Sequence, residues 1–139
     1  EGTVYGIPSI GFSLATHNPK ADFTAVQHFG KIILDNFLKH PVKADTFLNI
    51  NFPAVEISDI KGIRFCHQGK GQWIKEFEER TDPYGFNYYW MTGEFYNLEP
   101  ENQEVDHNLV DQKYISIVAH KIDTTDYQEI QRLNELWTF

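Results

Sequence analysis

The sequence predicts an α/β fold that carries a projecting β-hairpin and a terminal helix. Two strand-like segments, residues 7–14 and 46–52, enclose a stretch whose apolar residues recur every three or four positions, as on one face of a helix. Further along, two segments rich in β-forming residues flank a turn-forming tetrapeptide at residues 82–85. With 139 residues, the chain has the size of one ordinary domain.

The first strand-like segment, residues 7–14, mixes Ile, Phe and Leu with small Ser and Gly. This composition is typical of a strand that is covered on both faces and has neighbours on either side. Because the segment begins only a few residues into the chain, we expect the chain to be the later part of a larger domain. The partner of this part is then an amino-terminal segment that precedes Glu1.

The next segment predicts a helix that runs to about Lys39 and is stopped by His40 and Pro41. Asn18–Pro19 or Asp22 is expected to begin it by capping its free amides. Its apolar stripe, which should face a sheet, consists of Phe23, Val26, Phe29, Ile33 and Phe37.

Alternating patterns then predict strands at residues 46–52 and 62–69. In the former, Leu48, Ile50 and Phe52 share one face, while Asn49 and Asn51 share the other with a structural role. Residues 73–77 and 86–91 are predicted to form the projecting hairpin. This arrangement assigns residues 1–70 to the α/β core and residues 71–95 to the hairpin.

Residues 96–139 complete what we interpret as one incomplete domain. The acidic stretch from residue 94 to 111 has no period and predicts a surface loop, followed by a strand at residues 113–118. A terminal helix capped by Asp123, Thr124 and Thr125 follows, and its apolar residues are Tyr127, Ile130, Leu133, Leu136 and Trp137, with Phe139 at its end. A helix this short needs a packing partner, either this domain or another subunit, and we assign it to oligomerisation.

The negative net charge restricts the kinds of molecule that this chain can bind. Twenty acidic and 12 basic residues give a formal net charge of -8, which opposes binding to a nucleic acid polymer or an anionic membrane. A phosphorylated ligand would need a local cation to offset this field. No apolar stretch approaches the roughly 20 residues that span a bilayer. The one cysteine, Cys66, cannot form an intrachain disulfide, which favours a cytoplasmic origin.

The motif search finds neither a catalytic residue nor a metal ligand in this chain. The six histidines show no His-x-His or His-x-x-x-His pair, and there is no cysteine pair to complete a zinc site. No phosphate-binding glycine loop occurs, and Gly69–Lys70–Gly71 is interpreted as a turn. Ser13 lacks the Gly-x-Ser-x-Gly context of a nucleophile.

The order of several short motifs resembles the carboxyl-terminal half of the SurE (stationary-phase survival) family of metal-dependent phosphatases that act on nucleoside monophosphates. These motifs span most of the chain: Glu1-Gly2, Gly6-Ile7-Pro8-Ser9-Ile10, Ser13-Leu14, Leu48-Asn49-Ile50-Asn51-Phe52-Pro53, Lys61-Gly62-Ile63-Arg64, Tyr88-Tyr89-Trp90, Asp106 and Tyr114-Ile115-Ser116-Ile117. Two positions depart from the family pattern. Val105 stands where the family has Thr before Asp106, and residues 118–120 replace a Thr-Pro-Leu sequence.

The resemblance implies the carboxyl-terminal part of a Rossmann-like domain in a 5'-nucleotidase of the SurE type. It further implies a divalent cation, Mg²⁺ or Mn²⁺, held by paired aspartates, a Ser and an Asn that all lie upstream of residue 1. The implied substrate is a nucleoside monophosphate. The implied assembly is a homo-oligomer, a dimer or tetramer, in which the hairpin and terminal helix exchange between subunits. The chain alone is then expected to be inactive.

If the resemblance holds, the residues of this chain that reach the substrate lie at the rim of the pocket. Ser13 and Asn18 are candidates because ligands bind at the carboxyl ends of strands in open α/β sheets, and Asp106 is a further candidate if the acidic loop folds back over the site. The alternative is a noncatalytic oligomerisation or ligand-binding module. In it the aromatic hairpin, with Trp73, Tyr88, Tyr89 and Trp90, binds a sugar, a base or a partner protein.

Overall fold

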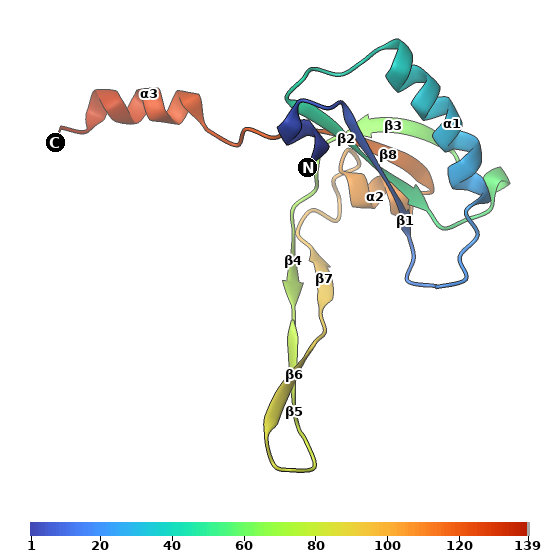
Figure 1. Cartoon of the computed structure of the whole chain (residues 1–139), viewed down its shortest axis with the longest axis vertical. Coiled ribbons are helices and arrows are strands. Elements are labelled where there is room, and N and C mark those ends of the chain that lie inside the picture. Colours follow the sequence, from blue (N-terminus) through green and yellow to red (C-terminus); the bar gives the residue numbers. More distant parts are fainter. Residues whose placement is uncertain (139) are drawn as a thin grey trace.

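The computed structural model describes residues 1–138, so Phe139 lies outside the described residues. Its body is a four-stranded sheet in the order β1-β2-β8-β3 (Figure 1). The strands are β1 (Ser9–Ala15), β2 (Thr46–Pro53), β3 (Gly62–Cys66) and β8 (Tyr114–Lys121). β1 and β2 are parallel, β8 is antiparallel to β2, and β3 is parallel to β8. The carboxyl end of β3 therefore lies at the opposite end of the sheet from those of β1 and β2.

Helix α1 (Thr24–Lys39) lies over one face of this sheet and confirms the predicted helix. The N-cap is Phe23, which makes no side-chain capping hydrogen bond, so the prediction that Asn18–Pro19 or Asp22 caps this helix is wrong; Asp22 lies one residue earlier and accepts a hydrogen bond from the Thr24 amide at 2.9 Å. The predicted inward face of β2 is also confirmed, because Ile50 and Phe52 are fully buried. The core between helix and sheet consists of Ile33, Phe37, Leu48, Ile50, Phe52, Ile115 and Ile117.

β1 has one neighbouring strand in this chain, whereas the sequence predicts neighbours on both sides in a larger domain. It lies at the edge of the sheet and pairs only with β2 among the described residues. Gly11 and Ser13 are exposed, and Phe12 keeps 41% of its surface accessible although its ring contacts Phe52. Residues 1–138 supply no strand beyond the outer edge of β1, so its second neighbour stays a prediction for a larger domain.

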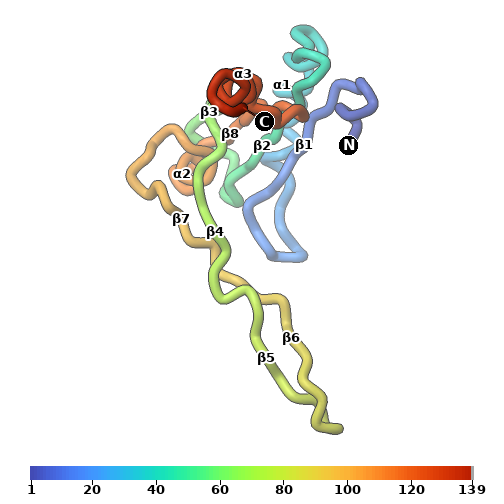
Figure 2. The backbone as a smooth tube through the Cα atoms, turned by 90° about the vertical axis from the view of Figure 1, so that its left-hand side faces the viewer, coloured from blue at the N-terminus to red at the C-terminus, as the bar shows by residue number. Residues whose placement is uncertain are grey.

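The predicted hairpin is confirmed and is longer than expected. Strand β4 (Gly71–Ile74) pairs with β7 (Glu94–Asn97), and β5 (Phe77–Thr81) pairs with β6 (Asn87–Met91). Between the two ladders the chain passes through positive φ at Lys75 (52°) and Gly93 (141°). We call residues 71–97 the arm, which extends far from the body in both views (Figure 2).

The acidic segment is not the surface loop that was predicted. Its first residues form β7, and Asp106–Asp111 form helix α2, which packs against β8 and β2. Val105 and Leu109 are buried there, with exposed fractions of 0% and 2%. The prediction was wrong because a six-residue helix is too short to show a period, so tertiary contacts decide its conformation.

The terminal helix α3 (Tyr127–Leu136) extends away from the body, and none of its residues is buried (Figure 1). Its cap is Asp126, whose carboxylate accepts a hydrogen bond from the Glu129 amide at 2.9 Å, rather than the expected residues 123–125. Short 3₁₀ helices occupy Gly2–Tyr5 (η1) and Ile57–Asp59 (η2). Within residues 1–138, no helix combines the length and apolar character that spanning a membrane requires.

Candidate functional site

A pocket of about 410 Å³ lies where β1 and β2 end. Because β1 and β2 are parallel, the loops that follow their carboxyl ends meet at one edge of the sheet. This edge is the usual ligand-binding position in open α/β sheets. The polar residues that line the pocket are Thr16, Asn18, Asp22, Glu56 and Asp59.

Local hydrogen bonds shape the loop after β1. The Asn18 amide donates to the Thr16 hydroxyl at 3.1 Å, and the Asn18 side-chain oxygen accepts from the Lys20 amide at 3.0 Å. This pattern is the Asx-type turn that Asn favours. At the far end of the loop, hydrogen bonds from the Thr24 hydroxyl and amide hold the pKa of the Asp22 carboxyl below its ordinary value. Asp22 is therefore a carboxylate at neutral pH.

The pocket carries negative charge. Three carboxylates, those of Asp22, Glu56 and Asp59, line it, and Asp59 is paired with Lys113 Nζ at 2.9 Å. A phosphate group entering this field would be repelled unless a cation offset it. Within residues 1–138, no group of three or more His, Cys, Asp or Glu side chains is arranged to hold a metal ion. These residues do not form a metal site by themselves.

Asn18 lines this pocket, whereas Ser13 does not. Leu14 contributes to the pocket, so Ser13, one residue earlier in the strand, points to the opposite face of the sheet. There it lies beside Asn51 in the adjacent strand, whose side-chain amide donates to the buried Ser116 hydroxyl at 3.5 Å. The two predicted rim residues therefore share one end of the sheet but not one face.

Asp106 lies at the other end of the sheet. Its Oδ1 atom accepts hydrogen bonds from the Gly69 amide at 3.0 Å and the His107 amide at 2.9 Å. Gly69 follows β3, whose carboxyl end is opposite to those of β1 and β2. Within one copy of this chain, Asp106 therefore does not share a rim with Ser13 and Asn18.

Sequence reasoning missed the loop after β2 as part of the site. No residue between positions 54 and 61 was predicted to belong to the site, yet Glu56 and Asp59 complete the pocket. The available signal was the end of a strand at Pro53, since the residues after parallel strands meet at the same edge. Nothing in the sequence indicated which strands run parallel to one another.

Cys66 is partly buried, and its thiol donates to the Ile117 carbonyl at 3.7 Å. Burial, and secondly the charge of Asp106, raises the pKa of this thiol. A thiol with a raised pKa is a poor nucleophile at neutral pH. Cys66 therefore behaves as a small apolar residue of β3.

The comparisons with known proteins agree with one another. Residues 1–75 match the family model described as "Survival protein SurE". The chain is 39% identical over 139 residues to a 5'-nucleotidase SurE from Cytophaga hutchinsonii, a match that covers 100% of this chain and 53% of that protein. It is 40% identical over 133 residues to the 5'-nucleotidase SurE of Bacteroides fragilis, covering 96% of the chain and 51% of the relative.

The fold is also that of a solved structure, the SurE protein from Aquifex aeolicus. The TM-score is 0.75 at 29% sequence identity, and the match covers 97% of this chain and 54% of that one. The chain thus spans about half the length of the relatives it matches. Because the family model covers more than half of its residues, this α/β chain belongs to the SurE family.

Proposed function

We propose that this chain is part of a 5'-nucleotidase that releases phosphate from nucleoside 5'-monophosphates. The observation that carries the proposal is the polar pocket at the carboxyl ends of β1 and β2, in a chain whose relatives are named 5'-nucleotidase SurE. In this proposal, the loops that contain Asn18 and Glu56 form one wall of the substrate site. Asn18 supplies hydrogen bonds within this pocket, and Ser13 reaches the substrate from the other face at the same end of the sheet.

The charge of the pocket supports the need for a divalent cation, Mg²⁺ or Mn²⁺, in the same proposal. The described residues do not fit such an ion, so its ligands are assigned to residues outside this chain. When bound, such an ion would polarise the phosphoryl oxygens and activate water. The carboxylates of Asp22 and Glu56 contribute the negative field that such a cation would offset.

The test compares the chain with a chimera. In the chimera, the part of the Cytophaga hutchinsonii relative that the match leaves uncovered is joined to residues 1–139. Phosphate release from a nucleoside monophosphate is measured with Mg²⁺ and with Mn²⁺. We expect turnover by the chimera and none by the chain alone. Turnover by the chain alone would show that its own residues form the active site, and an inactive but folded chimera would argue against the proposed function.

The roles of the rim residues are tested in the same chimera. Ser13→Ala or Asn18→Ala should raise KM or lower turnover by about fivefold, because each removes a net hydrogen bond of about 1 kcal/mol. Metal affinity should stay unchanged. Ser9→Ala is the matched control, since Ser9 lies on the same strand face as Ser13 but near the amino end of β1, where its hydroxyl donates to the Ile7 carbonyl. Equal effects of Ser13→Ala and Ser9→Ala would return Ser13 to a structural role.

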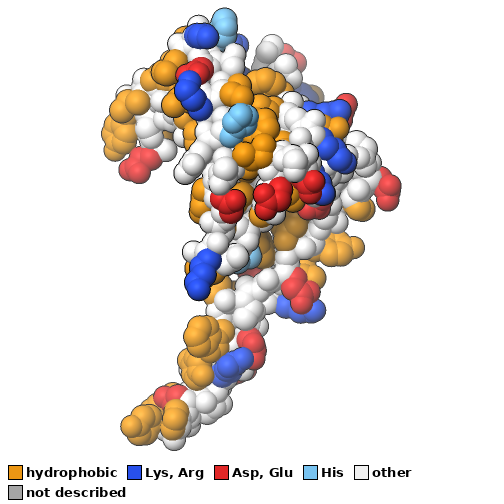
Figure 3. All heavy atoms as spheres, turned by 90° about the vertical axis from the view of Figure 1, so that its right-hand side faces the viewer, with side chains coloured by type: hydrophobic (Ala, Val, Ile, Leu, Met, Phe, Trp, Pro, Cys, Tyr) orange, Lys and Arg blue, Asp and Glu red, His pale blue; other side chains and the backbone are white. Residues whose placement is uncertain are grey.

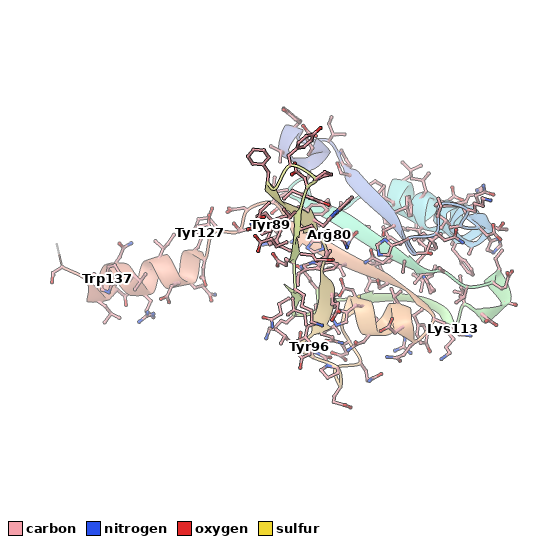
Figure 4. The ribbon with its side chains drawn as sticks, turned by 90° about the horizontal axis from the view of Figure 1, so that it is seen from below. Arg80, Tyr89, Tyr96, Lys113, Tyr127 and Trp137 are labelled. Atoms are coloured by element: carbon pink, nitrogen blue, oxygen red, sulfur yellow. The ribbon has the colours of Figure 1, made fainter. Side chains whose placement is uncertain are left out.

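We also propose that the chain forms a homo-oligomer, a dimer or tetramer, through the arm and α3. No residue of α3 is buried, and Ile130, Leu136 and Trp137 keep 47%, 63% and 59% of their surface exposed. Figure 4 shows Tyr127 and Trp137 on a helix well separated from the body. Analytical ultracentrifugation should find an oligomer that is weakened by deleting residues 122–139. A monomer at micromolar concentration would contradict this part of the proposal.

A second candidate function rests on the aromatic surface of the arm. Trp73, Tyr89 and Trp90 keep 59%, 61% and 54% of their surface exposed, which is a large apolar area for one hairpin. A noncatalytic module would use this surface to bind a sugar or a base. Quenching of tryptophan fluorescence by a nucleoside or monosaccharide, lost in Trp90→Ala, would favour the module. Unchanged fluorescence would favour oligomerisation as the role of the arm.

A further inference from the structure

The arm joins the body through two chain segments, residues 67–70 before β4 and residues 98–105 after β7. The strands of the arm pair only with one another. Neither ladder therefore sets the angle between the arm and the sheet. Hydrogen bonds from α2 reach both segments, and we call residues 67–70 together with 97–108 the collar.

Asn108 holds the segment that leaves the arm. It lies on α2 and is only 6% exposed. Its side-chain nitrogen donates to the carbonyls of Glu99 at 2.8 Å and Asn102 at 2.7 Å. Its side-chain oxygen accepts from the side-chain amide of Asn97, the last residue of β7, at 2.8 Å. The oxygen and the nitrogen of the buried Asn108 side chain are thus both hydrogen-bonded to this segment. Losing one of these partners would leave a buried polar atom unsatisfied, which lowers stability.

Asp106 holds the segment that enters the arm. Its Oδ1 atom accepts from the Gly69 amide at 3.0 Å, and its own amide donates to the His67 carbonyl at 3.1 Å. The two segments are also bonded to each other. The Lys70 amide donates to the Glu99 carboxylate at 2.7 Å, which lowers the pKa of that carboxyl, and the Leu98 amide donates to the Lys70 carbonyl at 3.1 Å.

A column of aromatic rings reinforces the collar. The ring of Trp73 in β4 contacts that of Phe95 in β7 at 5.9 Å between centroids, and Phe95 contacts His107 of α2 at 5.4 Å, both edge to face. The entering segment makes room for these rings with glycine. A Cβ atom at Gly69 would clash with His107, and one at Gly71 would clash with Phe95. The column therefore continues from the arm into the body.

We propose that Asn108 and Asp106 are positioning residues that hold the arm at a fixed angle to the sheet. The helix that carries them is itself anchored, since Val105 and Leu109 are 0% and 2% exposed. Apolar side chains are exposed on the far half of the arm (Figure 3), where Phe77, Trp90 and Met91 keep 63%, 54% and 82% of their surface accessible. If these side chains contact a second copy of this chain, a fixed angle reduces the entropy lost on association.

The experiment measures the angle in the whole chain by pulsed electron spin resonance. Cys66 is the only cysteine, so Cys66→Ser with Gln27→Cys on α1 and Tyr84→Cys at the arm tip gives one pair of spin labels. Both labelled positions are exposed. We expect a single narrow distance distribution. A distribution that is already broad without further changes would overturn the proposal.

Asn108→Leu has a similar volume but loses all three hydrogen bonds, and it should broaden the distribution. Amide exchange at Gly69 and Leu98 should also accelerate roughly tenfold, while exchange in β2 stays unchanged. Asn36→Leu is the matched control, because the same change removes a hydrogen bond from the Asn36 side chain to the Ile32 carbonyl within α1, outside the collar. A narrow distribution in folded Asn108→Leu would refute the role of Asn108.

A pair of substitutions at Asp106 keeps the test decisive even if Asn108→Leu does not fold. Asp106→Asn retains an oxygen that accepts from the Gly69 amide, so its distribution should match the parent. Asp106→Leu lacks that oxygen and should broaden the distribution, with the free energy of unfolding of the sheet little changed. Equal distributions for these two variants would show that the Asp106 carboxylate does not position the arm.

Discussion

The body and the arm use similar residues for opposite purposes. In the body, Ile50 and Phe52 are fully buried between α1 and the sheet. In the far half of the arm, Phe77, Trp90 and Met91 are 63%, 54% and 82% exposed. A two-stranded ladder has no second layer, so it cannot enclose its own apolar side chains. Apolar side chains of the body therefore stabilise the fold of the chain itself, whereas those of the arm are available to stabilise an interface.

The largest effect is expected in the body. Phe52→Ala should reduce the free energy of unfolding by about 3–5 kcal/mol, because it leaves a cavity beneath α1. Urea denaturation of the chain at low concentration measures this. Phe77→Ala, the same change in the arm, should alter the free energy of unfolding by less than about 0.5 kcal/mol. Equal losses for the two variants would break the distinction between the regions.

Association is expected to respond in the reverse order. Trp90→Ala should raise the dissociation constant of self-association at least about tenfold, since large aromatic residues dominate most interfaces. Its effect on the unfolding of the monomer should be negligible. Sedimentation equilibrium against concentration checks the first expectation. Unchanged association would show that Trp90 is not part of the interface and would favour a different ligand for the aromatic surface of the arm.

An intermediate effect is expected at the junction of the two regions. Gly69→Ala places a methyl group against His107, so the ring must shift, and this should reduce stability by about 1–2 kcal/mol. Gly11→Ala is the control, because the nearest atom to the new methyl group is the Leu48 carbonyl oxygen at 3.9 Å. Thermal unfolding of both variants provides the comparison. A neutral Gly69→Ala would show that the collar tolerates displacement of His107.

The smallest effect concerns the start of α3. Hydrogen bonds from Thr125 and Tyr127 lower the pKa of Asp123 from 3.8 to about 2. Because folding lowers this pKa, the contribution of Asp123 is complete above pH 4 and is lost as the pH falls through about 2. Order at Tyr127, followed by NMR, should decline over that range. Asp123→Asn should lack this pH dependence, and a decline of equal size in it would assign the effect to another carboxyl.

Both α1 and the inward face of β2 could be predicted from residue patterns alone, since their periods of 3.6 and 2 report directly which side is buried. The hairpin was predictable for a similar reason. Its turn carries Asp82, whose carboxylate accepts hydrogen bonds from the Tyr84 and Phe86 amides at 2.8 and 2.9 Å, a local preference of Asp in turns.

The candidate site was predictable only in part. Asn18 was found because it follows the first strand, and it lines the pocket. Ser13 lies at the same end of the sheet as Asn18, but it points to the other face, and its role at the rim stays a prediction. Asp106 lies at the opposite end of the sheet from Asn18 within this chain, because the direction of β3 relative to β1 depends on pairing with β8, whose partner residues are 52 positions further along the chain. Glu56 and Asp59 were missed for the same reason.

By itself, the sequence determined the local elements of this protein, its acidic charge and, through the order of its motifs, its family. Only the tertiary structure decided how those elements meet. It turned an acidic stretch without a period into β7 and α2, and it committed Asn108 and Asp106 to the base of the arm. The physical reason is that periodicity and turn preference act over a few residues, whereas the partners of a buried polar group are chosen by contacts between distant segments.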